Sequence, residues 1–299
     1  MQAVENSDHI TIVVATDNFY AILLAALIKS IEVNHKSGEH IDLYIIDDGI
    51  STTNKGKIAA SASPEVFTLH WFTTDQVVPP DFKAPKDRSA FPVTTYLRLF
   101  SPYIIPADAG KMIYLDVDMI VLNDISELWH TDLENRLFGA VIDLSETVGS
   151  SWGGIPNYKE LGLDPAAKYF NAGMMLINPK KWREQDISAK VIKAIVDNIE
   201  SVNFADQYGL NVVLVNQWKE LDKRWNSFSV LHSEDPYLIH FLDIKPIFKS
   251  NNTNKVYYGE FYKYLKMTPY KDFKPWSDYK RLFRKALIKG VKLIKSKLP

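Results

Sequence analysis

Two aspartates, Asp116 and Asp118, stand at the end of an apolar run, residues 111–122, that has the pattern of a buried strand. An ionised carboxylate beside a hydrophobic sheet is costly unless a cation or hydrogen bonds compensate its charge. Residues two apart on a strand point to the same face, so both side chains can reach one ligand. The pattern therefore indicates a metal site. The alternatives are that the two side chains face water or cap a helix.

The spacing of the pair also predicts a local change of direction. In a regular strand the two Cα atoms would lie roughly 6.6 Å apart. We expect the chain to turn at Val117 instead, so that both carboxylates lean toward one ion.

The composition is that of an ordinary globular enzyme. With 299 residues and 46% hydrophobic content, the chain suits one large α/β domain or two small ones. It contains no cysteine, which excludes a disulfide framework, a thiolate metal site and a cysteine nucleophile. The first residues lack the basic stretch of a signal peptide, and no apolar run has the length and continuity of a membrane span. We therefore expect a cytoplasmic protein.

The C-terminal end carries a charge pattern of its own. Residues 280–299 hold eight lysines and arginines and no acidic residue, although the whole chain has a net charge of −1. Apolar residues recur there at helical spacing, namely Phe283, Leu287, Val291, Ile294 and Leu298. A basic amphipathic helix of this kind predicts docking on an anionic membrane surface, with about 1 kcal/mol from each cation near the lipid. The alternative is a helix packed on the body with its charges in water.

The segment before this helix marks a boundary. Its prolines, at 269 and 275, stop regular structure, so we predict a catalytic domain over residues 1–267 and a basic tail over residues 268–299. A nucleic acid is not an expected partner, because the rest of the chain is acidic and shows no basic groove pattern.

Short apolar runs alternate with longer amphipathic ones along the chain. The short runs predict strands at residues 10–15, 41–46, 67–72, 112–115, 138–142 and 174–177. The longer runs predict helices at residues 20–35, 52–62 and 187–199. This alternation indicates an α/β fold with a mostly parallel sheet.

Ligands of such sheets bind at the carboxyl ends of the strands. Aspartates follow four of the predicted strands, at Asp17, at Asp47 and Asp48, at Asp116 and Asp118, and at Asp143. We therefore expect these carboxylates to gather at one rim of the sheet.

Seven segments, each weak alone, occur together in one order: residues 14–20, 94–98, 114–118, 139–143, 169–178 and 206–207, and His240 followed by Lys245 and Pro246. Together they resemble glycosyltransferase family 8, the retaining enzymes that include bacterial lipopolysaccharide galactosyltransferases and the glycogenins. The resemblance implies a GT-A type, Rossmann-like nucleotide-sugar-binding domain with a mostly parallel central sheet.

The resemblance also implies an activity. It predicts metal-dependent transfer of galactose or glucose from a UDP-sugar to a glycan or glycolipid, in bacterial cell-surface polysaccharide synthesis, by an enzyme peripheral at the inner face of the cell membrane. Asp116, Asp118 and His240 would hold Mn²⁺ or Mg²⁺, because oxygen ligands with one imidazole suit these ions. A lone histidine near an apolar segment is otherwise more often a satisfied core residue.

Further residues would bind the donor by the same resemblance. Asp17 would accept a hydrogen bond from the uracil N3–H and Tyr20 would flank the base, although Asp17 could equally cap a helix. Lys245 would neutralise the diphosphate, or else be a solvated loop lysine. Arg98 would reach the donor sugar or its phosphate, or else pair with a rim carboxylate. The other residues assigned to the donor are Ala15, Val117, Asp143, Asn171, Ala172 and Gly173, of which 171–173 match a loop that cradles the hexose.

The resemblance places Asp206 and Gln207 under the anomeric carbon, with Arg98 as the third catalytic residue. Retention needs either a covalent adduct or front-side attack within an ion pair. An amide oxygen such as that of Gln207 is a poor nucleophile. We therefore expect front-side attack, with the leaving phosphate oxygen taking the acceptor proton and Gln207 stabilising positive charge at the anomeric centre.

The chain departs from the family pattern at three places. Tyr208 stands where relatives often carry an aspartate, so an enzyme-bound adduct there is excluded. The loop after His240 lacks the usual glycine, lacks the tryptophan common after Lys-Pro, and is one residue shorter. Phe19 stands where an asparagine is frequent near the ribose.

Two other classes of function fit parts of the pattern. A haloacid-dehalogenase-type phosphohydrolase also uses an Asp-x-Asp at a strand end, but usually near the N-terminus and with Thr or Val at the position of Ile120. A non-catalytic UDP-sugar sensor or membrane-docked binding protein is favoured by Tyr208 and the altered loop. Residues 146–165, which include Trp152, are expected to form much of the acceptor wall, and nothing in the sequence distinguishes galactose from glucose.

Overall fold

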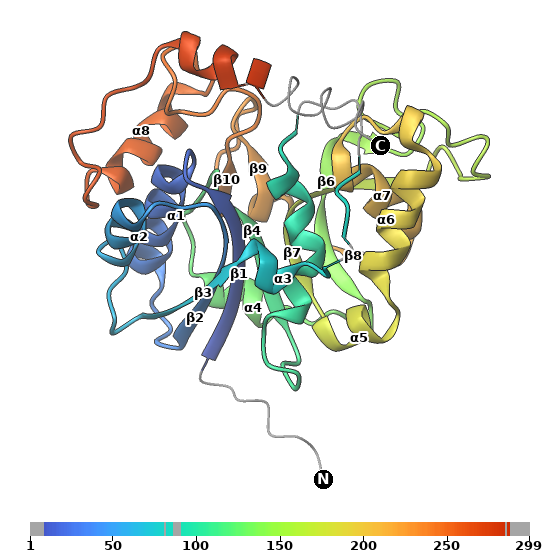
Figure 1. The fold of residues 1–299 in the computed structure, drawn as a ribbon, viewed down its shortest axis with the longest axis horizontal. Helices are drawn as coiled ribbons and strands as arrows, with labels where there is room; N and C mark the ends of the chain where they lie inside the picture. Colours follow the sequence, from blue (N-terminus) through green and yellow to red (C-terminus); the bar gives the residue numbers. More distant parts are fainter. Residues whose placement is uncertain (1–8, 81, 86–90, 285, 288–299) are drawn as a thin grey trace.

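The structure is a computed structural model that describes residues 9–80, 82–85, 91–284 and 286–287. Figure 1 shows a central sheet with helices on both faces. The sheet has seven strands in the order β3-β2-β1-β4-β7-β6-β8. These strands are β1 (His9–Asp17), β2 (His40–Asp48), β3 (Phe67–Thr73), β4 (Met112–Asp116), β6 (Phe138–Thr147), β7 (Lys168–Ile177) and β8 (Trp218–Glu220).

The sheet is mostly parallel, as the sequence predicts. β1 pairs in parallel with β2 and with β4, and β2 pairs in parallel with β3. β7 is antiparallel to both of its neighbours, β4 and β6. The sequence does not indicate this reversal, because β7 is apolar on both faces and such a run fits either direction.

Two hydrophobic clusters cover the two faces of the sheet. On β1, for example, Ile12 and Val14 belong to one cluster and Val13 to the other, as alternating side chains require. The principal helices are α1 (Ala21–Asn34), α2 (Thr52–Ala59), α5 (Pro179–Glu184), α6 (Ile187–Asp197), α7 (Ala205–Val213) and α8 (Lys255–Leu265). α1, α2 and α8 lie on one face, and α5, α6 and α7 on the other (Figure 1).

The remaining helical turns are short or of the 3-10 type. They are α3 (Thr74–Val77), α4 (Ile125–Trp129), η1 (Val93–Tyr103), η2 (Ile199–Ser201) and η3 (Lys223–Asn226). The three helices predicted from periodicity are confirmed as α1, α2 and α6. Arg98 lies on the 3-10 helix η1, where Pro102 is incompatible with a regular α-helix.

A second, three-stranded sheet completes the site. It has the order β5-β10-β9, with β5 (Met119–Val121), β9 (Ser227–Phe228) and β10 (Leu238–His240). β5 follows the aspartate pair directly, and it pairs antiparallel with β10 so that Met119 lies opposite His240. This pairing brings the imidazole beside two carboxylates that precede it by more than 100 residues in the sequence.

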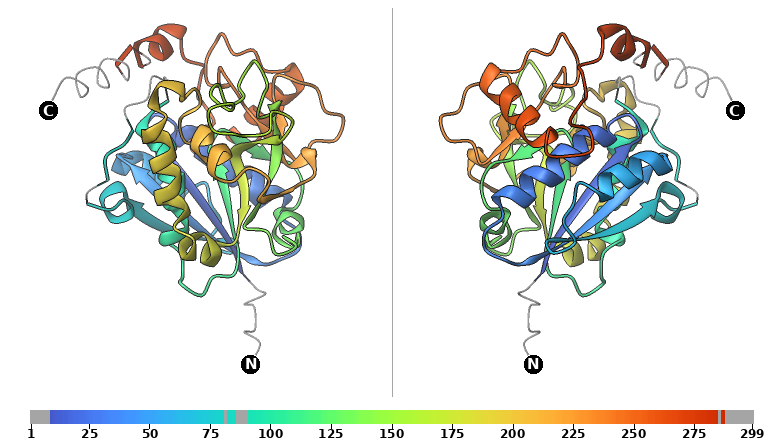
Figure 2. Two further views of the ribbon diagram at one scale, coloured as in Figure 1. Left: turned by 90° about the vertical axis from the view of Figure 1, so that its right-hand side faces the viewer. Right: turned by 90° about the vertical axis from the view of Figure 1, so that its left-hand side faces the viewer.

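The described part of the predicted tail packs on the body. Residues 278–284 are helical, and this segment lies at the end of the molecule where β1 and β4 terminate (Figure 2). Trp276 forms a β-bridge with Phe248 and contacts Phe19, the two ring centroids being 4.7 Å apart. The predicted tail residues 285 and 288–299 lie outside the described residues. Within the described part of the chain, we find no helix with the length and apolarity that a membrane crossing requires.

Asn34, on α1, joins β5 to α8 through hydrogen bonds, and its loss should destabilise the fold. Its amide nitrogen lies 2.9 Å from the Val121 carbonyl oxygen on β5 and 2.8 Å from the Tyr264 hydroxyl on α8. We expect Asn34→Ala to lower the free energy of unfolding by about 1–3 kcal/mol, because buried polar partners lose their hydrogen bonds. Urea denaturation followed by circular dichroism measures this. The exposed Glu65→Ala is the control, and equal midpoints for both variants would contradict the prediction.

Candidate active site

A cavity of about 620 Å³ lies at the carboxyl ends of the strands, a size typical of small-molecule sites. It collects nearly all the residues singled out in the sequence. Those that line it are Ala15, Asp17, Tyr20, Arg98, Asp116, Val117, Asp118, Asp143, Asn171, Gly173, Asp206, Gln207, His240 and Lys245. Ala172 is not among its lining residues, and neither are Asp47 and Asp48.

Asp47 and Asp48 have local roles instead. Asp47 accepts a hydrogen bond from the Ile50 backbone and pairs with Lys55, and Asp48 accepts one from the Thr94 hydroxyl. These aspartates do share one edge of the sheet, since Asp48 lies opposite Asp17 in the parallel pair. The two on β2 nevertheless stay outside the cavity, because Asp47 binds the segment that follows β2 and Asp48 binds Thr94 on η1.

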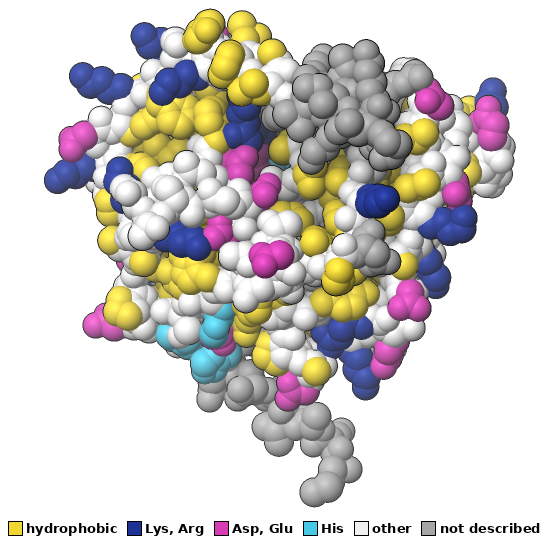
Figure 3. All heavy atoms as spheres, viewed as in Figure 1, with side chains coloured by type: hydrophobic (Ala, Val, Ile, Leu, Met, Phe, Trp, Pro, Cys, Tyr) yellow, Lys and Arg dark blue, Asp and Glu magenta, His cyan; other side chains and the backbone are white. Residues whose placement is uncertain are grey.

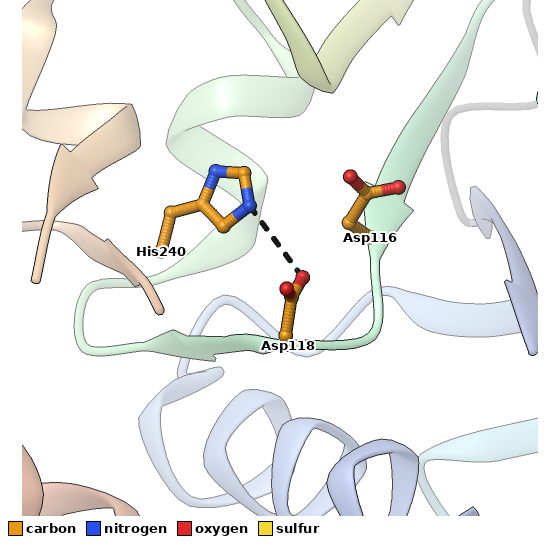
Figure 4. Close-up of side chains that lie close together, drawn as sticks. All are labelled: Asp116, Asp118 and His240. Carbon is orange, nitrogen blue, oxygen red and sulfur yellow. Dashed lines mark ion pairs between the residues drawn. The ribbon is translucent and has the colours of Figure 1, made fainter. Parts of the chain in front are cut away.

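Asp116, Asp118 and His240 form a compact cluster. Asp116 ends β4, and Asp118 lies in the turn before β5. One ligand atom from each side chain lies within 4.8 Å of the other two (Figure 4). The side chains are 25%, 13% and 4% exposed, respectively. The predicted turn at Val117 is present, and it brings both carboxylates toward the imidazole.

The imidazole of His240 is held by a residue that the sequence analysis did not identify. Its Nδ1 lies 3.0 Å from Oδ1 of Asn226, whose amide in turn donates to Asn171 at 3.0 Å. Because Asn226 offers an oxygen to Nδ1, a proton on Nδ1 satisfies this contact and leaves Nε2 to meet the carboxylates. Nε2 lies 3.5 Å from Oδ1 of Asp118 and so faces the cluster.

This donor set fits a divalent cation. Two carboxylates and one imidazole nitrogen converge on one point, and a partner of this kind behind a ligating histidine is usual at metal sites. Oxygen ligands with a single imidazole suit Mn²⁺ and Mg²⁺, and the nitrogen favours Mn²⁺.

Gly173 keeps the cluster open. A Cβ at this position would lie 2.5 Å from His240 and 3.0 Å from an oxygen of Asp116. The sequence predicts a loop at residues 171–173, but the structure places them inside β7. The pairing of β6 with β7 shifts its register there, so an irregular strand, rather than a loop, faces the cavity.

Lys245 supplies positive charge to the cluster. Its ammonium pairs with Asp118 and donates to the Phe241 carbonyl at 2.7 Å. Burial alone would raise the pKa of Asp118, but the charge of Lys245 and the contact with His240 hold that pKa below its ordinary value. Lys245 is therefore an ordered member of the site and not a solvated loop lysine.

Arg98 balances the second carboxylate. It is 6% exposed, and its guanidinium lies 3.3 Å from Asp116 and 2.7 Å from Asp206. Burial would lower the pKa of Arg98, but these two carboxylates raise it overall, so the guanidinium stays charged. Burial raises the pKa of the fully buried Asp206 to about 7, although Arg98 opposes this rise. Arg98 therefore pairs with carboxylates, as the alternative for this residue predicts, and it also lines the cavity.

Gln207 lies in a fixed orientation. Its Oε1 accepts hydrogen bonds from the Ala172 backbone at 3.0 Å and from the Asn171 amide at 3.3 Å, and its Nε2 donates to Asp143 at 3.3 Å. Both lone pairs of the amide oxygen are therefore engaged. Tyr208, which follows Gln207 and departs from the family pattern, is fully buried and does not line the cavity. Its hydroxyl donates a hydrogen bond to Asn157 at 2.8 Å.

Asp17 has partners at both carboxylate oxygens. Oδ1 accepts from the backbone N–H groups of Phe19 and Tyr20, at 3.0 and 3.1 Å, at the start of α1. Oδ2 pairs with Arg284, from the described part of the tail. Asp17 therefore organises the turn before α1 and is not the helix cap that the alternative predicts, because the N-cap of α1 is Tyr20. Arg284 is a tail residue that the sequence analysis did not place here.

Two aromatic side chains that pack on each other, Trp152 and Phe204, also line the cavity. Trp152 is 60% exposed, and its ring meets that of Phe204 edge to face at a centroid distance of 6.0 Å. Both line the cavity together with Gln207. The segment expected to form the acceptor wall thus contributes a large exposed ring beside the catalytic candidates.

Comparison with known proteins identifies one family whose model matches most of the chain. The family model of glycosyl transferase family 8 matches residues 11–280. General stress protein A of Bacillus subtilis (strain 168) is 29% identical over 278 residues, which cover 86% of this chain and 93% of that protein. Lipopolysaccharide 1,2-glucosyltransferase of Escherichia coli (strain K12) is 24% identical over 77% of this chain, which spans 66% of that relative.

Solved structures of glycosyltransferases have a similar fold. The galactosyltransferase LgtC, solved with donor and acceptor sugar analogs, matches with a TM-score of 0.71 at 26% identity, over 87% of this chain and 96% of that chain. The WbbM bifunctional glycosyltransferase matches in fold with a TM-score of 0.73 at 22% identity, over 94% of this chain and 53% of that chain. The predicted α/β architecture of the GT-A type is confirmed.

Asn226 should tune metal affinity through His240. We expect Asn226→Ala to weaken Mn²⁺ binding about 10–100-fold, because the imidazole loses the acceptor that fixes its tautomer and orientation. Asn226→Asp keeps an acceptor oxygen and should retain more of the affinity. Manganese electron paramagnetic resonance titration measures both, with thermal unfolding as the check on folding. Equal affinity in wild type and Asn226→Ala would show that His240 does not ligate the ion.

Proposed function

The chain belongs to glycosyltransferase family 8, and from this premise we propose that it is a metal-dependent retaining hexosyltransferase. It would move galactose or glucose from a UDP-sugar to a glycan or glycolipid acceptor in bacterial cell-surface polysaccharide synthesis. The observation that carries the proposal is the cluster of Asp116, Asp118 and His240, with Lys245 beside it, in a cavity of about 620 Å³. Relatives named as a glucosyltransferase and a galactosyltransferase support a hexose donor without separating the two sugars.

Mn²⁺ or Mg²⁺ held by the cluster would neutralise the negative charge that develops on the diphosphate as the glycosidic bond breaks. Lys245 would bind the same diphosphate as a point charge. Its present partner, Asp118, is one of the proposed metal ligands, so a cation on that carboxylate would compete with the ammonium for it. The freed ammonium would then be available to a phosphate oxygen.

The fixed Gln207 supports front-side attack. A nucleophile needs a free lone pair, whereas both lone pairs of the Gln207 amide oxygen accept hydrogen bonds. In our proposal the acceptor hydroxyl oxygen forms the new bond to the anomeric carbon on the face that the nucleotide leaves. The electrons of the breaking bond remain on the phosphate oxygen, which takes the hydroxyl proton. Gln207 and the Asp143 carboxylate would then face the positive charge at the anomeric centre.

Trp152 and Phe204 are proposed to form the acceptor side. The C–H faces of a pyranose ring are apolar and pack well on aromatic rings, and a large ring exposed in a cavity offers such a face. Trp152 shares the cavity with Gln207, so a sugar packed there would lie on the catalytic side of the pocket.

The described tail supports the proposal of a membrane-docked enzyme at the inner face of the cell membrane. Its helix turns arginines toward the cavity and leaves its apolar side chains outside. Tyr279, Leu282, Phe283 and Leu287 are 73%, 56%, 53% and 52% exposed. Figure 3 shows apolar side chains gathered at the top of the view, where Figure 1 draws this segment. Exposed apolar residues next to a lysine-rich continuation suit an anionic bilayer surface.

The sensor alternative loses one of its two supports. Tyr208 packs in the core and leaves the cavity unchanged, so it does not distinguish a sensor from an enzyme. The altered loop after His240 still delivers Lys245 to the cluster. We therefore favour catalysis.

The activity should depend on the metal cluster. We expect the purified chain to release UDP from UDP-galactose or UDP-glucose with Mn²⁺, and EDTA to abolish the release. Asp118→Asn should lower the rate on the order of 10²-fold, because a ligand of the charge-stabilising ion is lost. Asp108→Asn, at an exposed position, is the matched control and should keep the wild-type rate. A panel that includes UDP-GlcNAc and UDP-GalNAc tests the donor; no metal-dependent release from any of the four would refute the function.

The basic end should carry the membrane binding. We expect a variant that ends at Arg284 to bind anionic vesicles at least about 100-fold more weakly than the full chain, because five lysines worth about 1 kcal/mol each are removed. Its release of UDP from soluble donor should stay within about twofold of wild type. Co-sedimentation with anionic and with neutral vesicles measures the difference. Equal binding of both proteins to anionic vesicles would remove the anchor proposal.

A further inference from the structure

Residues 276–284 are the part of the tail that reaches the cavity. Backbone hydrogen bonds hold the first of them, Trp276, beside the loop that carries Lys245. The Trp276 backbone N–H donates to the Ile247 carbonyl at 2.8 Å, and the Trp276 carbonyl accepts from Lys249 at 3.0 Å. These hydrogen bonds position the start of the segment, and the helix that follows contributes Arg281 and Arg284 to the lining of the cavity.

Arg284 lies at the base end of the predicted donor site. It pairs with Asp17, and its guanidinium lies 4.3 Å from the ring centroid of Phe19 and 4.6 Å from that of Tyr20. Its side chain is only 19% exposed. A cation sandwiched in this way is ordered, because ion pairing and cation–π contacts act together.

Arg284 lines the same cavity as Lys245 and Asp118, the residues that we assign to the diphosphate and its cation. Burial raises the pKa of the Tyr20 phenol, and the positive charges of both Lys245 and Arg284 oppose that rise. The phenol therefore lies within electrostatic range of both cations and also of Asp118. A diphosphate bound between Lys245 and the metal cluster would come close to this tail arginine.

Arg281 is the second tail arginine in the cavity. Its Nε lies 3.5 Å from a carboxylate oxygen of Asp278, and this nitrogen is buried without a hydrogen-bond partner. A buried guanidinium nitrogen without an acceptor is costly unless a ligand supplies one. Lys280, directly before Arg281 in the sequence, lies instead over the Trp276 ring at 4.8 Å and does not line the cavity.

The charge balance of the cavity explains why a donor would need these arginines. Among the described residues, six carboxylates and four lysine or arginine side chains line it. Two of the four cations, Arg98 and Lys245, come from the body, and both already pair with aspartates. Arg281 and Arg284 are the other two. A dianionic diphosphate entering the body alone would meet a strongly negative surface.

We propose that Arg281 and Arg284 are donor-binding residues, which the C-terminal segment contributes to recognition of a nucleoside diphosphate. Their planar guanidinium groups bind phosphate oxygens, Arg281 through its buried Nε, which has no hydrogen-bond partner, and Arg284 by turning from Asp17 toward the diphosphate. This inference rests on the proposed use of a nucleotide-sugar donor. It assigns to the tail a function in the donor site that is separate from membrane docking.

Calorimetric titration of the full chain with UDP in the presence of Mn²⁺ tests the proposal. We expect Arg281→Ala and Arg284→Ala each to weaken UDP binding about 10-fold or more, as the loss of a charged hydrogen bond does. Arg284→Lys keeps the charge and should recover part of the affinity. Uridine, which lacks phosphates, should bind wild type and both alanine variants within about threefold of one another.

The control is Lys274→Ala, an exposed residue of the same tail, which should bind UDP like wild type. UDP binding that is unchanged in both arginine variants would overturn this inference alone. Tighter UDP binding by Arg284→Ala would also overturn it, because Arg284 would then be an occupant that the donor must displace. A wild-type chain that binds no UDP would overturn the proposed function, and this inference with it.

Discussion

Two carboxylates at a largely buried strand end impose the constraint on which this site depends. Asp116 and Asp118 are only a quarter exposed or less, and isolated charges at such a position are unstable. Arg98 compensates the first and Lys245 the second, while His240 faces both. The residues that we propose to bind a diphosphate and its cation are therefore also those that compensate these two charges within the fold. Structural and functional demands on these side chains coincide, so a substitution among them affects both.

The sequence predicts those parts of the site that one segment determines. The apolar run before Asp116 indicates a strand, and the Asp-x-Asp spacing requires the turn at Val117, which the structure contains. Six strands of the main sheet and the helices α1, α2 and α6 likewise follow from local periodicity, whereas the short strands β5, β8, β9 and β10 and the helices α7 and α8 were not predicted. Asn226 was not predictable in this way, because it reaches His240 only through the pairing of β9 with β10 and no motif contains it. The antiparallel direction of β7 was missed for the same reason, since pairing is a long-range property.

The resemblance predicted which residues line the cavity, but some of them make contacts in the structure that it did not imply. Gly173 was expected to admit the donor sugar, but its immediate neighbours are His240 and Asp116, so glycine is already required by the cluster itself. Asp17 was expected to read the base, yet Oδ1 organises the turn into α1 and Oδ2 binds Arg284. Both residues therefore have a role in the local structure that needs no ligand. A pattern match alone does not separate that role from contact with a ligand.

The orientation of the described tail follows from charge. Apolar periodicity alone favours a helix with its apolar face on the body, but Arg281 and Arg284 face the cavity while Phe283 and Leu287 stay exposed. A cavity with more carboxylates than body cations attracts guanidinium groups, and the apolar face is left for another surface. If that surface is a bilayer, one helix contacts the cavity through its arginines and the membrane through its apolar side chains. A lipid-linked acceptor would then approach the sugar donor from the side on which the tail already lies.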